Sequence, residues 1–193
     1  IEANQDITLI TRNGRSMRFN EEEVRQMGRV STGVKGIGLR EDDEVVDMVV
    51  VGSSDSQLLT ICENGYGKRT GQDEYPRKHR GGMGVIDIKT TDRNGPVVAC
   101  KEVLGDDEVM IVTQDGVLIR TEVGGISTVG RNTQGVRVIN LGEGDRVIDM
   151  TRVPKSEEES EVDEAAAAES ENVVNNVSEE SADSAQTPPE ESE

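Results

Sequence analysis

The sequence of 193 residues is long enough for one domain of about 100 to 200 residues. Only 33% of its residues are apolar and 2% are aromatic, against about 45 to 50% apolar in ordinary globular domains. Much of the formal charge of −18 lies at one end, because residues 154–193 contain 14 acidic residues, one lysine and no aromatic residue. Such a segment cannot bury enough apolar surface to fold, so we expect a packed body over residues 1–153 and a disordered acidic tail over residues 154–193.

Two further classes of protein are disfavoured by the sequence. No apolar run approaches the ~20 residues that cross a bilayer, which favours a soluble, cytoplasmic protein without a membrane partner. The two cysteines, Cys62 and Cys100, lie in separate apolar runs without the spacing of a disulfide scaffold or a zinc site. We therefore expect both thiols to be buried as small apolar groups and no metal to be bound.

The first 51 residues predict four short strands. Residues 7–11 form a mainly apolar run that ends at Asn13-Gly14, a dipeptide that favours a tight type I′ hairpin, and a return strand follows it. Residues 21–27 allow at most a short turn of helix. A third strand opens at Gly33-Val34, and residues 45–51 supply a fourth.

The same pattern returns twice at a spacing of 51 residues, without an insertion. The first strands are residues 58–62 and 109–113, and the fourth strands are residues 96–100 and 146–151. Identical residues recur at this spacing: Gly14, Gly65 and Gly116; Arg18, Arg69 and Arg120; Arg29, Arg80 and Arg131; Gly33, Gly84 and Gly135; Val34, Val85 and Val136; Ile37, Ile88 and Ile139. The predicted fold is all-β, with three four-stranded blades of a propeller-like disc. Since propellers usually have four or more blades, we expect the chain to be the C-terminal half of a larger disc.

Four segments resemble the last blades of the C-terminal domain family of DNA gyrase A proteins. They are NGYGKRT from Asn64, the EYP-plus-basic run at 74–80, GVIDIKTTDRNG from Gly84 and VGRNTQGVRVI from Val129. The resemblance implies a six-bladed β-pinwheel, with three blades present here, that wraps double-stranded DNA around a basic rim. The family's Gln-Arg-Arg-Gly-Gly-Lys-Gly wrapping motif is absent, and residues 79–84 (HRGGMG) look like a degenerate counterpart of it.

The resemblance also implies a holoenzyme. Gyrase A proteins join gyrase B proteins in an A2B2 heterotetramer, an ATP-dependent type II topoisomerase that introduces negative supercoils. ATP and Mg belong to that holoenzyme, and no cofactor or catalytic residue is expected in this segment. The corresponding protein of topoisomerase IV is an alternative within the family, and a protein-binding propeller that does not bind DNA is an alternative outside it.

Candidate DNA-binding residues follow from the repeat. Wrapping needs cations at intervals along a curved surface, because the ligand is a phosphate backbone. Two arginines recur in every copy, and other cations surround the equivalent loops. The predicted set is Arg18, Arg29, Lys35, Lys68, Arg69, Arg77, Lys78, Arg80, Arg120, Arg131 and Arg137. A recurring arginine is also compatible with a structural ion pair within each blade. The acidic tail has two possible roles: it solvates the protein, or it competes with DNA for the basic rim.

Overall fold

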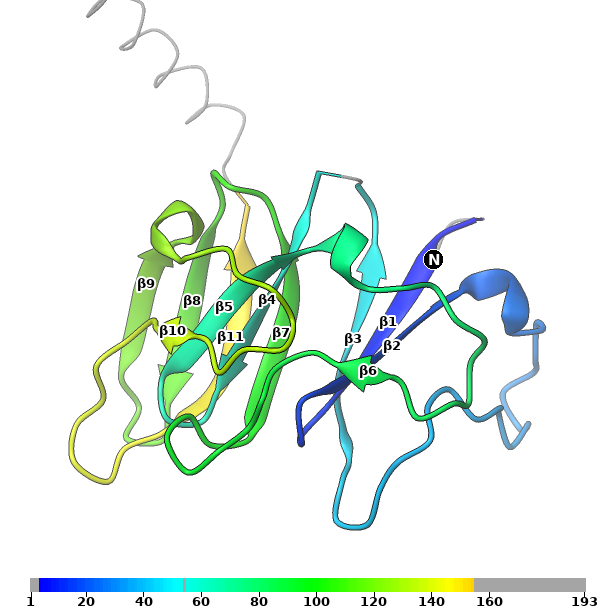
Figure 1. Cartoon of the computed structure of the whole chain (residues 1–193), viewed down its shortest axis with the longest axis horizontal. Helices are drawn as coiled ribbons and strands as arrows, with labels where there is room; N and C mark the ends of the chain where they lie inside the picture. The colour runs from blue at the N-terminus through cyan, green and yellow to red at the C-terminus, as the bar shows by residue number, and fades with distance from the viewer. Residues whose placement is uncertain (1–3, 54, 155–193) are drawn as a thin grey trace, which may run out of the picture. The chain divides into compact units, whose positions relative to one another are not determined.

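The computed structural model describes residues 4–53 and 55–154, which form three antiparallel sheets (Figure 1). The first sheet contains β1 (Asp6–Thr11), β2 (Arg15–Asn20), β3 (Val45–Val51) and β6 (Val85–Ile86), in the order β3-β1-β2-β6. The second contains β4 (Gln57–Cys62), β5 (Tyr66–Gly71), β7 (Val97–Val103) and β10 (Val136–Arg137), in the order β10-β5-β4-β7. The third contains β8 (Glu108–Thr113), β9 (Leu118–Glu122) and β11 (Val147–Val153), in the order β11-β8-β9.

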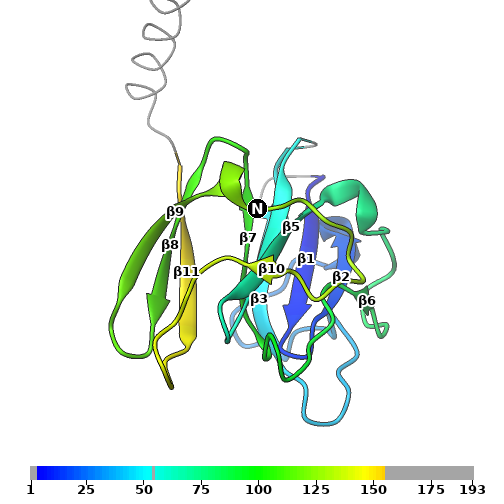
Figure 2. The same ribbon diagram turned by 60° about the vertical axis from the view of Figure 1, so that its left-hand side comes forward.

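The all-β fold and its strand-rich repeats are confirmed, but the third strand of the second repeat and that of the third repeat each join the preceding sheet. The third strand predicted from Gly33-Val34 in the first repeat is not formed, and the third sheet has three strands among the described residues instead of the predicted four. β6 belongs to the second repeat and pairs with β2 of the first sheet. β10 belongs to the third repeat and pairs with β5 of the second sheet, as Figure 2 shows. Each joint between neighbouring blades therefore contains an exchanged strand. Most of the predicted tail, residues 155–193, lies outside the described residues, and its disorder stays a prediction.

The hairpin turns differ from the predicted type I′. Gly14 has a φ of +74°, but Asn13 before it has a negative φ, so only one of the two central residues is left-handed. The amide of Gly14 donates to the Thr11 carbonyl at 3.0 Å, and Gly65 and Gly116 make the equivalent bonds. The loop is thus a turn of three residues with its glycine in the left-handed region, a common alternative in hairpins.

A short 3-10 turn follows the second strand of every repeat. These turns are η1 (Glu21–Glu23), η2 (Gln72–Glu74) and η3 (Val123–Gly125), again 51 residues apart. The sequence predicted only the first of them, which begins where the Asn20 side chain accepts a hydrogen bond from the Glu22 amide at 3.0 Å. Within the described residues, no helix has the length and apolarity needed to cross a membrane.

The fourth strands of the repeats lie next to one another. β7 contacts both β3 and β11, so these strands form the inner side of the three blades, whereas β6 and β10 lie at the opposite, outer edge. Cys62 and Cys100 are buried free thiols, which confirms their predicted burial. Burial raises the pKa of Cys62 to about 12 and raises that of Cys100 well above its ordinary value.

Candidate nucleic-acid interface

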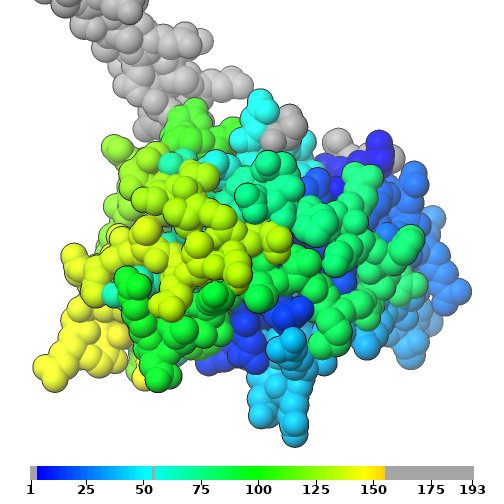
Figure 3. All heavy atoms as spheres, viewed as in Figure 1, coloured from blue at the N-terminus to red at the C-terminus, as the bar shows by residue number. Residues whose placement is uncertain are grey.

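The loops that lead from the 3-10 turns to the exchanged strands cover the outer edge of the blades. Figure 3 shows them from one side, where the segment of residues 76–90 lies over the first blade and the segment of residues 127–140 over the second. Most of the predicted DNA-binding residues belong to this edge. The structure assigns two different environments to them, because some are bound to the neighbouring blade and others are open to solvent.

The first recurring arginine connects each blade to the next. Arg18 is bound to Asp6 at 2.8 Å and also donates to the Tyr75 carbonyl of the second repeat at 3.3 Å. Arg69 donates to the equivalent carbonyl of the third repeat, that of Ile126, at 2.6 Å. Charged donors on backbone carbonyls are strong hydrogen bonds, so the recurrence of these two arginines is explained by blade docking.

Arg120, the third member of this series, has a different environment. It binds Glu108, which is the equivalent of the Asp6 that binds Arg18, and its side chain is 54% exposed.

The second recurring arginine points back to the preceding blade. Arg80 donates to the carbonyl of Lys35 at 3.0 Å, and Arg131 donates to the carbonyl of Ile86 at 2.8 Å, which is the equivalent atom one repeat later. Both guanidinium groups are only partly exposed. Arg29, the member in the first repeat, is exposed in a loop. Arg80 and Arg131 thus have a structural role, whereas Arg29 is open to solvent.

Lys68 was predicted as a DNA contact, and that prediction is wrong because the residue is fully buried. Its ammonium group donates to the Thr70 hydroxyl at 2.8 Å and to the carbonyls of Gly130 and Arg131 at 3.1 and 3.2 Å. The Asp87 carboxylate lies 3.9 Å away. Burial lowers the pKa of Lys68, and the nearby Asp87 opposes that shift. No DNA phosphate can reach this site.

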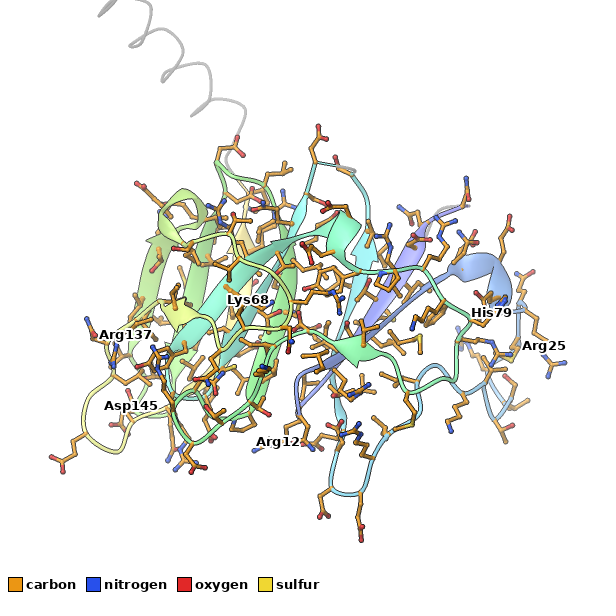
Figure 4. The ribbon with its side chains drawn as sticks, viewed as in Figure 1. Arg12, Arg25, Lys68, His79, Arg137 and Asp145 are labelled. Carbon is orange, nitrogen blue, oxygen red and sulfur yellow. The ribbon has the colours of Figure 1, made fainter. Side chains whose placement is uncertain are left out.

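A group of exposed cations lies beside η1 and η2. Arg77 is 59% exposed and has one ion pair, with Asp6 at 2.9 Å. Lys78 is exposed, and the adjacent His79 is 99% exposed, 3.3 Å from the Glu23 carboxylate. Figure 4 shows His79 at the same end of the structure as Arg25. These side chains present a basic surface at the outer edge of the first blade.

A second cationic group lies at the joint between the second and third sheets. The guanidinium carbons of Arg93 and Arg137 lie 4.7 and 4.9 Å from the centre of the Tyr66 ring. Arg137, which lies opposite Tyr66 in the strand register, also donates to its hydroxyl at 2.7 Å. The hydrogen bond from Arg93 is the main factor that lowers the pKa of this hydroxyl. One aromatic ring therefore holds two cations close together.

The surroundings of this pair favour an anionic ligand. Both arginines are exposed, and neither has an ion pair with any carboxylate of residues 4–53 and 55–154. The loop that carries Arg93 is fixed to the third repeat, because the Asn94 amide donates to the Gln134 carbonyl at 3.1 Å. The exposed Lys89 belongs to the same loop. We call Lys89, Arg93 and Arg137 the joint cations.

Sequence reasoning found only part of this group. Arg137 was predicted as a flanking cation, as was Lys35, its equivalent in the first repeat, which is exposed. Lys89 and Arg93 lie in the basic stretch of the second repeat but were not included in the predicted set. The equivalents of Arg93 in the other repeats are Asp42 and Gly144, so the repeat gave no signal at that position. The pairing of Tyr66 on β5 with Arg137 on the exchanged strand β10 is the feature that would have indicated this cation site.

Comparison with known proteins identifies relatives of the whole described region. The family model described as DNA gyrase C-terminal domain, beta-propeller, matches residues 5–52, 56–103 and 107–154. The chain is 46% identical over 158 residues to the DNA gyrase A protein of Salmonella typhimurium, a match that covers 82% of the chain and 18% of that protein. The chain thus spans about a fifth of the length of the curated relatives it matches.

Two solved structures have the same fold. A structure of the DNA gyrase A C-terminal domain superposes with a TM-score of 0.74 at 29% identity, over 79% of this chain and 52% of that one. The C-terminal domain of DNA topoisomerase IV superposes with a TM-score of 0.75 at 26% identity, over 88% of this chain and 52% of that one. The two structures are similar to this chain to nearly the same degree, but curated relatives at 44 to 47% identity are DNA gyrase A proteins, which favours gyrase over the topoisomerase IV alternative.

Proposed function

Because this chain belongs to the DNA gyrase C-terminal domain family, we propose that it binds double-stranded DNA along the outer edge of its blades and bends the duplex there. The observation that carries the proposal is the arrangement of the joint cations. Arg93 and Arg137 are exposed, close together and unneutralised by any described carboxylate, and Lys89 is in the same loop. A phosphate backbone supplies the counter-charge that this group lacks.

The other proposed contacts extend this surface along the outer edge. They are the exposed cations Arg29, Lys35, Arg77, Lys78 and Arg120. The recurring arginines Arg18, Arg69, Arg80 and Arg131 hold neighbouring blades together, so their contribution to DNA binding is mainly to space the exposed cations. Bending 20 to 30 base pairs by 40 to 90° costs about 1 to 6 kcal/mol, so several contacts must act together.

We further propose that the chain acts within a gyrase holoenzyme. In that assembly it is a non-catalytic segment of an ATP-dependent type II topoisomerase, with the gyrase B protein as the partner in an A2B2 heterotetramer. Curvature that the blades impose on bound DNA is then converted into negative supercoils by cleavage and strand passage elsewhere. ATP and Mg act in those other parts of the enzyme, and the cytoplasm is the expected location.

Fluorescence anisotropy with a labelled duplex of about 30 base pairs tests the DNA contact. Each phosphate contact adds about 0.9 to the slope of log affinity against log salt. Replacement of both Arg93 and Arg137 by alanine should therefore reduce the slope by about 1.8. At 0.1 M salt the same relation gives a loss of roughly eightfold in affinity for each arginine.

The matched control is Arg12→Ala, an exposed arginine that is already paired with Glu44. This variant should leave both the affinity and the salt slope unchanged. Equal losses in the control and in the double variant would contradict the assignment of the joint cations. No DNA affinity of the unaltered chain at low salt would instead favour a protein-binding propeller.

A further inference from the structure

The joint between the second and third blades places a tyrosine hydroxyl next to two exposed arginines. We propose that Tyr66, Arg93 and Arg137 form a site for one backbone phosphate of double-stranded DNA, in which the Tyr66 hydroxyl donates its hydrogen to a phosphate oxygen. This site rests on the proposed function, because its ligand is the same duplex. It adds an uncharged contact, and a dependence on pH, to the contacts that the arginines make.

The hydroxyl of Tyr66 accepts hydrogen bonds from the protein but donates none to it. Arg137 donates to its oxygen at 2.7 Å, and Arg93 also acts on it through a hydrogen bond. A guanidinium group has donors only, so neither arginine can accept the hydroxyl hydrogen. No other group of residues 4–53 and 55–154 accepts a hydrogen bond from it. The ring is 8% exposed, whereas the hydroxyl end lies at the surface with few atoms around it, so an external acceptor can reach the hydrogen.

The two arginines favour an anion over a neutral acceptor. Their guanidinium carbons lie 4.7 and 4.9 Å from the centre of the same ring, and like charges held so close repel each other. Within the described part of the chain, no carboxylate forms an ion pair with either of them. A phosphate carries its negative charge on oxygens that accept from several donors at once. Such charge-assisted hydrogen bonds are about twice as strong as neutral ones.

The backbone around the site fixes its three donors. Tyr66 on β5 lies opposite Arg137 on β10 in the strand register. The Asn64 side-chain amide donates to the carbonyls of Asp92 and Arg93, at 3.0 and 3.3 Å. The loop that carries Arg93 is therefore attached to the turn that precedes Tyr66. Donors that are already in place lose little entropy when a ligand binds.

The first joint lacks this site, although its strands have the same register. Arg15 and Ile86 occupy the positions of Tyr66 and Arg137 and are also Cα partners. The Arg15 guanidinium donates to two carbonyls of the second repeat, at 2.7 and 3.1 Å, so these donors are used within the structure. The side chain of Ile86 has no donor. The phosphate site is thus specific to the second joint and is not a property of every repeat.

The ionisation state of the hydroxyl determines whether it can donate. The hydrogen bond from Arg93 lowers the pKa of Tyr66 from its ordinary 10.0; burial opposes this shift, and the charges of Arg137 and Arg93 add to it. These two arginines, one from the loop and one from β10, are the charged groups that act on the hydroxyl. Once ionised, the oxygen has no hydrogen to donate and repels the phosphate. Affinity for DNA should therefore be complete at neutral pH and fall as the pH rises toward the pKa of Tyr66.

The Tyr66→Phe variant of the full chain tests the hydroxyl contact, because phenylalanine keeps the ring beside both arginines. Loss of a hydrogen bond to a charged group should weaken the binding of the labelled duplex about tenfold at pH 7. The slope of log affinity against log salt should not change, since it counts neutralised phosphates and both arginines remain. The matched control is Ser127→Ala, an exposed residue whose hydroxyl binds no arginine among the described residues. Neither the affinity of this control nor the circular dichroism spectrum of either variant should change.

The pH profile of DNA binding supplies the second measurement. Between pH 7 and about 9.5, the affinity of the unaltered chain should fall relative to that of Tyr66→Phe, because only the unaltered chain ionises at this position. The tenfold difference at pH 7 should therefore become smaller as the pH rises. Titration of lysines or of the duplex affects both chains alike and cancels in the ratio of their affinities.

The outcomes distinguish the hydroxyl contact from the proposed DNA surface. If Tyr66→Phe binds as tightly as the unaltered chain while replacement of Arg93 and Arg137 lowers the salt slope, the arginines bind DNA and the hydroxyl does not. If Tyr66→Phe lowers the slope by about 0.9, the tyrosine only positions an arginine. A ratio of affinities that stays constant with pH, or an equal loss in Ser127→Ala, also overturns the hydroxyl contact. If replacement of both arginines leaves the slope unchanged, the DNA surface itself is wrong and the phosphate site is wrong with it.

Discussion

Four equivalent buried or half-buried positions hold polar side chains in the second repeat and apolar residues or glycine in the first and third repeats. In the second repeat the four positions hold a polar set: Thr60, Lys68, Tyr75 and Asp87. In the first repeat they hold Leu9, Met17, Val24 and Gly36, and in the third Ile111, Ile119, Ile126 and Val138. In all three repeats the fourth, first and second strands pair in the same order, so this order does not depend on which set is present.

The polar set is closely connected by hydrogen bonds. The Asp87 carboxylate accepts from the hydroxyls of Thr60, at 2.9 Å, and Tyr75, and Lys68 lies 3.9 Å away. In the first repeat the corresponding space is taken by Leu9, because a Cβ on Gly36 would lie 2.5 Å from the Leu9 methyl carbon. A large residue at the position of Leu9 thus requires a small residue at the position of Gly36. Because such neighbours constrain one another, we expect the four positions to change together, which explains why the repeats differ at all four of them.

The largest effect is expected from breaking the polar set at one point. Asp87→Ala leaves the Lys68 ammonium buried without its carboxylate, and loss of one partner of a buried pair costs about 3 to 5 kcal/mol. Val138→Ala, the equivalent change in the third repeat, only removes apolar volume and should cost about 1 to 2 kcal/mol. Urea unfolding at neutral pH measures both. Equal losses would show that the second blade does not depend on its ionic pair.

The second blade should also be the one that responds to alkaline pH. Cys62 has a folded-state pKa of about 12 against an ordinary 9.0, and the equivalent residues in the other repeats, Thr11 and Thr113, do not titrate. A raised pKa gives stability that is complete below the ordinary value and is lost as pH rises toward the folded one. Three pH units correspond to about 4 kcal/mol between pH 9 and 12.

Two other buried groups of this blade act in the same direction, since burial also raises the pKa of Cys100 and of Tyr75. Lys68 acts in the opposite direction, because its lowered pKa makes folding more favourable as pH rises to its ordinary 10.5. Between pH 9 and 11, the unfolding free energy of the Cys62→Ala chain, measured with urea, should fall with pH less steeply than that of the unaltered chain, by about 1.4 kcal/mol per pH unit. An unchanged slope would mean that Cys62 ionises without unfolding.

A smaller effect is expected where the second blade meets the third. Arg69→Ala removes a part-buried charged hydrogen bond to the Ile126 carbonyl and a solvent-exposed one to the Gly124 carbonyl, with an expected total loss of about 1.5 to 3 kcal/mol. Arg120→Ala, the equivalent change in the third blade, removes an exposed ion pair worth about 0 to 1 kcal/mol. Thermal unfolding of the two variants compares them. A greater loss of stability from Arg120→Ala than from Arg69→Ala would mean that the contacts of Arg120 stabilise the structure more than the contacts of Arg69 between the second and third blades.

Much of this fold could be predicted from the sequence, because apolar runs and turn glycines at a spacing of 51 residues mark the first, second and fourth strands. The partner of the third strand could not. β6 has two residues, and nothing in Val85 and Ile86 indicates that they pair with the preceding blade. The site could not be fully predicted for the same reason. Arg69 recurs because it binds carbonyls of the next repeat, and those carbonyls lie beside it only because a strand of that repeat joins the second sheet.

The smallest effect should come from exchanging the whole polar set for that of the first repeat. Thr60→Leu, Lys68→Met, Tyr75→Val and Asp87→Gly together remove both charges, so no buried ion is left without a partner. Replacement of buried ionic sets by apolar residues is often neutral or stabilising, and we expect a change in unfolding free energy within about 2 kcal/mol.

Agreement would show that the two sets are alternative solutions for one blade backbone. The four single variants should then each be less stable than the quadruple variant, because each mixes the two solutions. Urea unfolding of all five chains measures the coupling. The alternative outcome is a quadruple variant that loses as much unfolding free energy as the four single changes added together. That result would mean that the second blade requires the polar set. The position of this blade between two others, rather than the mutual fit of the four side chains, would then determine which residues it contains.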